Sequence, residues 1–190
     1  MGSVVGVLAL QGAFRAHELI LQRLDVTTRD VRTPADLDAV DALIMPGGES
    51  TTMSRLLHTS GLFDPLAQRL AAGMAAFGTC AGMILLATTV LDGRPDQRSF
   101  STLPISVRRN GFGRQVDSFE TDLAVAGLDT PFHGVFIRAP RIVEASPEVE
   151  VLAHYDGEPV LVRHGRVMAA SFHPELGGDV RVHATFLQEV

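Results

Sequence analysis

Cys80 is the only cysteine of the chain, and it stands in the sequence Gly78-Thr79-Cys80-Ala81-Gly82 after an apolar run. Gly-x-Cys-x-Gly is the cysteine form of a nucleophile elbow, in which glycines let a strand turn into a helix within a few residues. Such a turn holds the nucleophile in a strained, exposed position, and the start of the following helix favours a thiolate. A lone cysteine is more often a small buried hydrophobic residue, but these flanking glycines favour a nucleophile.

A base for this thiol is expected from His173, which follows the apolar residues 167–172. Glu175 stands two residues further on, across Pro174, whose ring fixes the local backbone. At this separation the carboxylate reaches one imidazole nitrogen while the other nitrogen faces Cys80, as in a nucleophile–base–acid triad. His-Pro-Glu alone is a weak signal; its place downstream of Gly-x-Cys-x-Gly makes it a specific one.

A glycine-rich turn, which contains Gly47 and Gly48, follows the apolar residues 42–45. Glycines here let backbone N–H groups turn toward a ligand, which predicts an oxyanion hole, and Ser50 or Thr51 is expected to cap the next helix. The alternative is an ordinary connection between a strand and a helix. A phosphate-binding loop is excluded, because no Gly-Lys-Ser/Thr sequence follows and the chain has no lysine.

Composition limits the class of protein. The chain has 190 residues, of which 46% are hydrophobic, which fits a single α/β domain over residues 1–190 with a substantial core. Its formal net charge of −6 argues against binding to nucleic acid, and no apolar run has the length of a membrane span. One cysteine excludes an internal disulfide, fits a reducing cytoplasm and leaves no zinc cluster, so neither a metal nor a cofactor is expected.

Apolar runs alternate with amphipathic segments along the first half of the chain. Helices are expected between these runs, at residues 14–24 and 81–87 among others. This alternation predicts parallel strands joined by right-handed crossovers, and therefore a doubly wound, three-layer α/β fold of flavodoxin-like type with a mostly parallel central sheet. Ligands of such sheets bind beyond the carboxyl ends of the strands, where both the glycine turn and Cys80 fall. The strands predicted in this half are residues 4–10, 26–32, 42–45 and 75–78.

The second half is richer in short strands, which predicts a smaller antiparallel region. Residues 91–97 are expected to form a polar loop, and a last helix is predicted from about residue 179. The strands predicted here are residues 105–109, 116–120, 134–137, 149–155, 160–162 and 167–172.

Taken together, these motifs resemble the class I glutamine amidotransferases, and within them the glutaminase subunits of pyridoxal 5′-phosphate synthase. The similarity extends over nearly the whole chain. Two departures from the family pattern are the stretch 94–104 and Gly111, where relatives often carry alanine or serine. The most specific stretches are residues 6–13, 46–52, 78–82, 109–120, 134–140 and 171–176.

The resemblance implies hydrolysis of L-glutamine to L-glutamate and ammonia through a thioester on Cys80, with His173 as the base and Glu175 orienting it. It further implies a partner, the barrel-shaped synthase subunit, which receives the ammonia within a large hetero-oligomer. The oxyanion hole is expected at the N–H groups of Gly48 and Ala81. The residues expected to bind glutamine are Gly47, Gly48, Glu49, Ser50, Arg109, Ile137 and Arg138.

Three alternatives remain open from the sequence. The chain could be a glutaminase that serves a different synthase, which the identity of the activating partner would decide. It could belong to a peptidase-like or deglycase-like branch with the same elbow, which usually lacks His-Pro-Glu after a late strand. It could also be a non-catalytic binding protein with a vestigial triad, and labelling of Cys80 by a glutamine analogue would decide that case.

Overall fold

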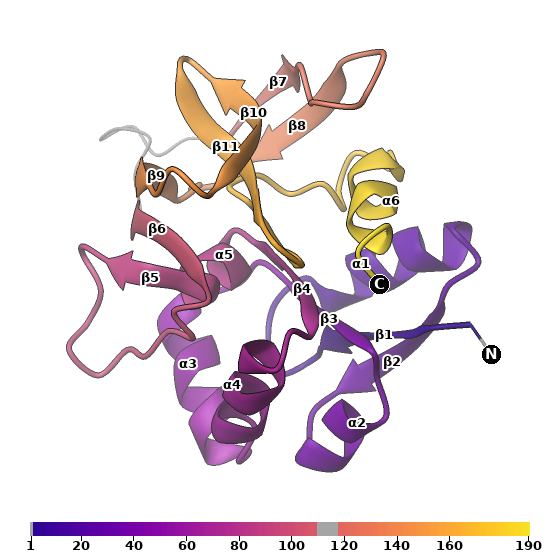
Figure 1. Cartoon of the computed structure of the whole chain (residues 1–190), viewed down its shortest axis with the longest axis vertical. Coiled ribbons are helices and arrows are strands. Elements are labelled where there is room, and N and C mark those ends of the chain that lie inside the picture. Colours follow the sequence, from indigo (N-terminus) through magenta and orange to yellow (C-terminus); the bar gives the residue numbers. More distant parts are fainter. Residues whose placement is uncertain (1, 110–117) are drawn as a thin grey trace.

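The computed structural model describes residues 2–109 and 118–190. Within them, the largest sheet has seven strands in the order β10-β11-β12-β4-β3-β1-β2. The five strands from β12 to β2 are parallel to one another, whereas β11 pairs antiparallel with both β12 and β10 (Figure 1). These strands are β1 (Val4–Leu8), β2 (Thr27–Val31), β3 (Ala42–Met45), β4 (Ala75–Thr79), β10 (Glu150–Tyr155), β11 (Glu158–His164) and β12 (Val167–Ala170).

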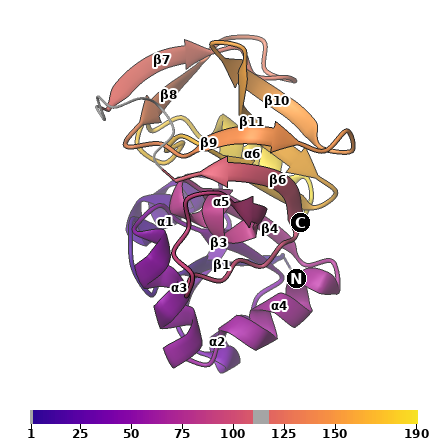
Figure 2. The same cartoon turned by 90° about the vertical axis from the view of Figure 1, so that its left-hand side faces the viewer.

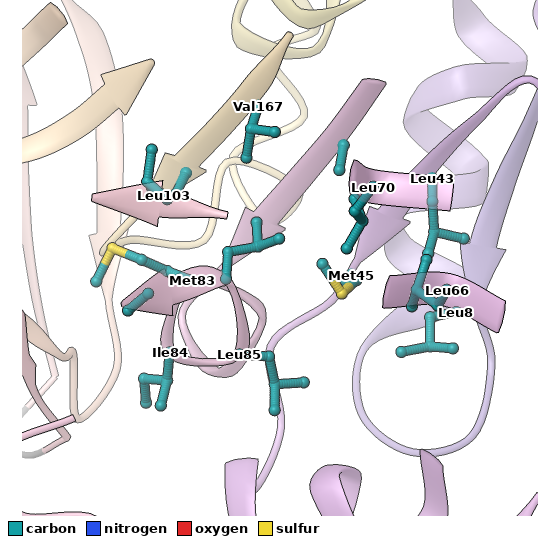
Figure 3. Packing of buried hydrophobic residues seen from close by; sticks show 14 of the residues in the cluster. Leu8, Leu43, Met45, Leu66, Leu70, Met83, Ile84, Leu85, Leu103 and Val167 are labelled. Atoms are coloured by element: carbon teal, nitrogen blue, oxygen red, sulfur yellow. The ribbon is translucent and has the colours of Figure 1, made fainter. Parts of the chain in front are cut away.

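The central strands are apolar on both faces, and their alternate side chains enter two different cores. In β3, Ala42 and Ile44 belong to one buried cluster, while Leu43 and Met45 belong to the other. This is the period of two that a pleated strand imposes, and burial of both faces is typical of parallel sheets. Figure 3 shows part of the cluster that contains Leu43 and Met45, with Met45 near side chains of the helices on that face of the sheet.

Helices complete a three-layer arrangement around this sheet. One face is covered by α2 (Pro34–Asp38), α3 (Ser50–Thr59), α4 (Phe63–Ala71) and α5 (Ala81–Leu86), and the other by α1 (Phe14–Arg23) and α6 (Arg181–Leu187). The predicted doubly wound α/β fold with a mostly parallel central sheet is therefore confirmed. Among the described residues, no helix combines the length and the apolar character that crossing a membrane requires.

Two smaller sheets extend the second half of the chain. A three-stranded sheet has the order β5-β6-β9, and β7 pairs antiparallel with β8. Figures 1 and 2 place the β7–β8 pair at the end of the molecule opposite α2. The strands are β5 (Ala87–Val90), β6 (Leu103–Arg108), β7 (Phe119–Leu123), β8 (Phe132–Phe136) and β9 (Arg141–Ala145).

Several predicted boundaries differ from the structure. The helix predicted to reach residue 87 ends at Leu86, because the next four residues pair with β6 as strand β5. Strand β9 was not predicted. Strand β7 is displaced toward the C-terminus from the predicted strand 116–120. Residues 116 and 117 of that prediction lie outside the described residues, as does Gly111. The atypical stretch 94–104 is anchored where α5 ends: Phe100 and Thr102 donate backbone hydrogen bonds to carbonyls of that helix.

Gly82 in α5 packs against the backbone at the end of β3. A Cβ atom at Gly82 would lie 2.0 Å from the carbonyl oxygen of Met45, a backbone atom that cannot move aside. We expect Gly82→Ala to lower the free energy of unfolding by about 3 kcal/mol, the upper range for overpacking, as measured by urea denaturation. Gly177→Ala is the control, since its Cβ would lie 3.5 Å from the nearest atom. Equal stability of the two variants would contradict this reading of the elbow.

Candidate active site

Cys80 occupies the sharp turn between β4 and α5. Its backbone has φ 50° and ψ −103°, a strained left-handed conformation for a residue with a side chain. Its N–H donates to the carbonyl of Ala170 in β12 at 2.8 Å, which anchors the turn to the neighbouring strand. The strained elbow predicted from the sequence is confirmed, but Cys80 is only 8% exposed, because it lines a cavity instead of standing free on the surface.

His173 and Glu175 follow β12, the strand next to β4. The His173 N–H donates to the carbonyl of Val135 in β8 at 2.8 Å, which fixes the segment between two sheets. His173 Nδ1 lies 2.7 Å from Glu175 Oε1, and both side chains are buried. The predicted reach of the carboxylate across Pro174 is therefore present.

Strand order explains why these distant residues meet. Strand β4 lies between β12 and β3, so the carboxyl end that carries Cys80 is flanked by His173 on one side and by Gly47 on the other. A Cβ atom placed on Gly47 would lie 2.4 Å from His173 Cε1 and 3.4 Å from Cys80 Cβ. The glycine is required by this close approach, because any side chain would displace the imidazole.

The charges of the three groups are coupled. Burial by itself lowers the pKa of His173, but hydrogen bonds and charge interactions with Cys80 and Glu175 outweigh it and raise the pKa of His173 to about 10. Burial likewise opposes ionisation of Glu175, yet the neighbouring His17 and the hydrogen bond with His173 lower the pKa of that carboxyl. At neutral pH His173 is therefore an imidazolium that interacts with the Glu175 carboxylate on one side and with the Cys80 side chain on the other.

The glycine turn after β3 is held by the segment that follows β1. The Gly47 carbonyl accepts a hydrogen bond from Ala13 N–H at 3.0 Å, and Glu49 N–H donates to Gln11 Oε1 at 2.9 Å. Strands β1 and β3 are neighbours, so both turns emerge at the same edge of the sheet. Gln11 and Ala13 line the cavity although no role was assigned to them from sequence; the signal was their position directly after the first strand.

Glu49 and Arg109 form the charged side of the cavity. Arg109 Nη2 donates to Glu49 Oε1 at 3.0 Å, and Arg109 Nε is buried without a hydrogen-bond partner among the described residues. Glu49 also accepts from the N–H groups of Thr51 and Thr52, so Glu49 caps α3, and the expected cap by Ser50 or Thr51 is wrong. Burial raises the pKa of Glu49, but these hydrogen bonds dominate and lower it to about 2.

One cavity of about 440 Å³ brings the predicted site residues together. Glu175 does not line this cavity; it lies behind His173. Arg138 reaches the cavity from a left-handed conformation, with φ 43°, just after β8. Within residues 2–109 and 118–190, no three His, Cys, Asp or Glu side chains are grouped to hold a metal ion. The predicted residues that line the cavity are Gly47, Gly48, Glu49, Ser50, Cys80, Ala81, Arg109, Ile137, Arg138 and His173; Gln11, Gly12, Ala13 and Ile84 line it without having been predicted.

Solved structures share this architecture. One described as a glutamine amidotransferase matches with a TM-score of 0.92 and 51% identity, over 97% of this chain and 97% of the other. A structure described as PurLQS from Thermotoga maritima matches with a TM-score of 0.68, over 99% of this chain and 99% of the other. At 18% identity the second likeness shows the fold alone. The class of protein is therefore that of the glutamine amidotransferases.

Sequence comparison narrows the class. Residues 7–190 match the SNO glutamine amidotransferase family. The protein named pyridoxal 5′-phosphate synthase subunit PdxT of Mycobacteroides abscessus is 52% identical over 100% of this chain and 98% of its own length. The protein of the same name from Nocardioides sp. is 53% identical over 98% and 95%. The chain belongs to the SNO glutamine amidotransferase family.

Proposed function

We propose that this chain is the glutaminase subunit of a pyridoxal 5′-phosphate synthase, and that it hydrolyses L-glutamine to L-glutamate and ammonia through Cys80, His173 and Glu175. The glutaminase activity follows from the family and from relatives about half identical over their full length. The observation that carries the triad is geometric: Cys80 and His173 line the same cavity, and Glu175 holds the far nitrogen of the imidazole.

In the first half of the reaction, the Cys80 sulfur attacks the side-chain amide carbon of glutamine. The oxyanion of the tetrahedral intermediate accepts hydrogen bonds from the N–H groups of Gly48 and Ala81, each donor lowering the barrier by about 3 kcal/mol. The imidazolium of His173 gives its proton to the departing nitrogen, so the C–N bond breaks, ammonia leaves and a thioester remains.

In the second half, water attacks the thioester carbon while His173, now neutral, accepts a proton from the water. The same N–H groups stabilise the second oxyanion, and collapse of this intermediate breaks the C–S bond. Glutamate leaves, and the sulfur and imidazolium are restored. Throughout, Glu175 keeps the imidazole in one orientation and stabilises its positive form.

Glutamine is a free amino acid with one carboxylate and one ammonium group, and the cavity offers both complements. The Arg109 guanidinium is suited to the carboxylate, and the Glu49 carboxylate to the ammonium group. The ion pair between them, at 3.0 Å, holds both groups at the cavity wall before substrate binds. Ser50, Ile137 and Arg138 complete the substrate side of the cavity in this proposal.

The proposed partner is the synthase subunit, which is a barrel enzyme within a large hetero-oligomer. The chain has sixteen basic residues and all are arginines, so condensation chemistry through a lysine imine belongs to another polypeptide. Ammonia released into neutral water is mostly protonated and no longer nucleophilic, so the two subunits must dock during turnover. A cytoplasmic setting is proposed with this function, because the lone cysteine must remain a thiol; neither nucleic acid nor membrane is a proposed partner.

The direct test measures glutamate release from glutamine by the purified chain, alone and with the synthase subunit. We expect docking to complete the oxyanion hole and to raise kcat about 100-fold, the effect of one such donor. Equal turnover with and without the partner would contradict the docking step. Absence of glutamate release in both samples would contradict the function itself.

A further inference from the structure

Two buried histidines lie behind the catalytic side chains. His17 on α1 and His183 on α6 are both 0% exposed, and His17 Nδ1 lies 2.9 Å from His183 Nε2. The other nitrogen of His17, Nε2, lies 3.2 Å from Thr79 Oγ1 and 3.5 Å from Glu175 Oε2. Thr79 directly precedes Cys80, so His17 contacts the strand that carries the nucleophile as well as the acid of the triad.

Glu175 uses its two oxygens unequally. Oε1 pairs with His173, while Oε2 has no hydrogen-bond partner among the described residues and its side chain is fully buried. A buried carboxylate oxygen without a donor is costly. The Nε2 atom of His17, at 3.5 Å, is the group placed to supply that donor.

The protonation of the histidine pair follows from burial and geometry. Burial lowers the pKa of His17, against the charge of Glu175, and burial lowers the pKa of His183 further, so each ring is neutral and carries one N–H. If His17 donated from Nδ1, its bare Nε2 would face the Glu175 carboxylate, and His183 Nδ1–H would be a buried donor without a partner among the described residues. In the reverse arrangement His183 Nε2–H donates to His17 Nδ1, and His17 Nε2–H points at Thr79 and Glu175. His183 Nδ1 then remains buried as an unpartnered acceptor, but the Glu175 carboxylate faces a donor instead of a bare nitrogen.

We propose that His17 is a positioning residue for the glutaminase reaction, whose Nε2–H holds Glu175 in line with His173 while His183 fixes the tautomer of His17. The inference rests on the proposed function of the triad. It extends the hydrogen-bonded chain from Cys80 through His173 and Glu175 to a donor on α1, with an anchor on α6. Without that donor the carboxylate rotates toward other partners, and the imidazole loses its fixed orientation.

The test compares His17→Leu, which removes both nitrogens, with His17→Gln, whose amide N–H reaches the position of Nε2. In the complex with the synthase subunit, we expect His17→Leu to lower kcat about tenfold, as loss of an outer partner does at other sites, with little change in KM for glutamine. His17→Gln should restore most of kcat. Should His17→Leu not fold, His17→Asn replaces it, since asparagine still bonds to His183 but does not reach Glu175.

Leu21→Ala is the matched control, because Leu21 is buried one turn further along α1 and its side chain has no N–H that could donate to Glu175. A loss of kcat in Leu21→Ala equal to that in His17→Leu would mean that only helix packing matters, and would overturn the proposal. Wild-type kcat in a folded His17→Leu variant would overturn it as well.

A second readout does not require turnover. The His173 Nδ1 proton, in a 2.7 Å hydrogen bond to Glu175, should give a downfield proton resonance in the wild-type chain. We expect this resonance to shift or broaden in His17→Leu and to persist in His17→Gln and Leu21→Ala. If the wild-type chain released no glutamate, the proposed function would fail, but the comparison of resonances would still decide whether His17 positions Glu175 and His173. An unchanged resonance in His17→Leu would overturn the proposed role of His17.

Discussion

Cys80→Ala is expected to abolish glutamate release by the complex, with kcat reduced by about 10⁴-fold or more, as removal of a nucleophile does in other triads. The reason is that in the proposed mechanism the sulfur forms the thioester, and the remaining donors of the cavity cannot supply a covalent intermediate. Binding should persist, because the groups proposed to hold the carboxylate and ammonium of glutamine, Arg109 and Glu49, are untouched. Glutamate production by the assembled synthase is the measurement.

The control for Cys80→Ala uses the product that the variant cannot make. Ammonium salt added to the complex should restore formation of the coenzyme by the synthase subunit, because only the supply of ammonia is lost. This separates loss of chemistry from loss of assembly. Substantial glutamate release by Cys80→Ala would exclude the sulfur as nucleophile, whereas failure of ammonium to rescue would mean that the substitution disturbs docking.

The meeting of Cys80, His173 and Glu175 could be predicted from the sequence because each residue stands in a local pattern at or just after the end of a strand. Cys80 lies between glycines at a strand-to-helix turn, and His173 follows an apolar run at the end of another strand. Parallel strands place their carboxyl ends at one edge of the sheet, so these local signals converge without knowledge of the full topology. The order of the strands, which places β4 between β12 and β3, became known only from the structure.

Features that depend on contacts between distant segments were not predicted. Gln11 was not assigned a role, although its side chain holds the glycine turn by accepting from Glu49 N–H. The pairing of Arg109 with Glu49 and the histidine pair behind the triad also depend on tertiary contacts. Strand β5 was missed for a different reason: Ala87 was assigned to the preceding helix, and the three β-branched residues after it form a run too short to predict as a strand without its partner β6.

His173→Ala is expected to reduce kcat by about 10³-fold or more, since the thiol then lacks its proton acceptor and the departing nitrogen lacks its acid. The raised pKa of His173, about 10, can be checked without substrate. An NMR titration of the wild-type chain should show this imidazole still protonated at about pH 8, well above the ordinary histidine pKa of about 6.5. A His173 imidazole that is neutral at about pH 8 would contradict its ion pair with Glu175.

The same raised pKa has a consequence for stability that requires no chemistry at Cys80. A histidine with a pKa of about 10 in the folded chain and about 6.5 in the unfolded chain binds more protons when folded. Its contribution to the free energy of unfolding is therefore complete below about pH 6.5 and is lost as pH rises toward about 10. Urea denaturation should show this loss in wild type and in His154→Ala, whose histidine is exposed on β10, but not in His173→Ala. If all three chains lost stability in parallel as pH rises, the titrating group would be one other than His173. Only a group that the substitution removes can make the stability curve of His173→Ala differ from that of wild type.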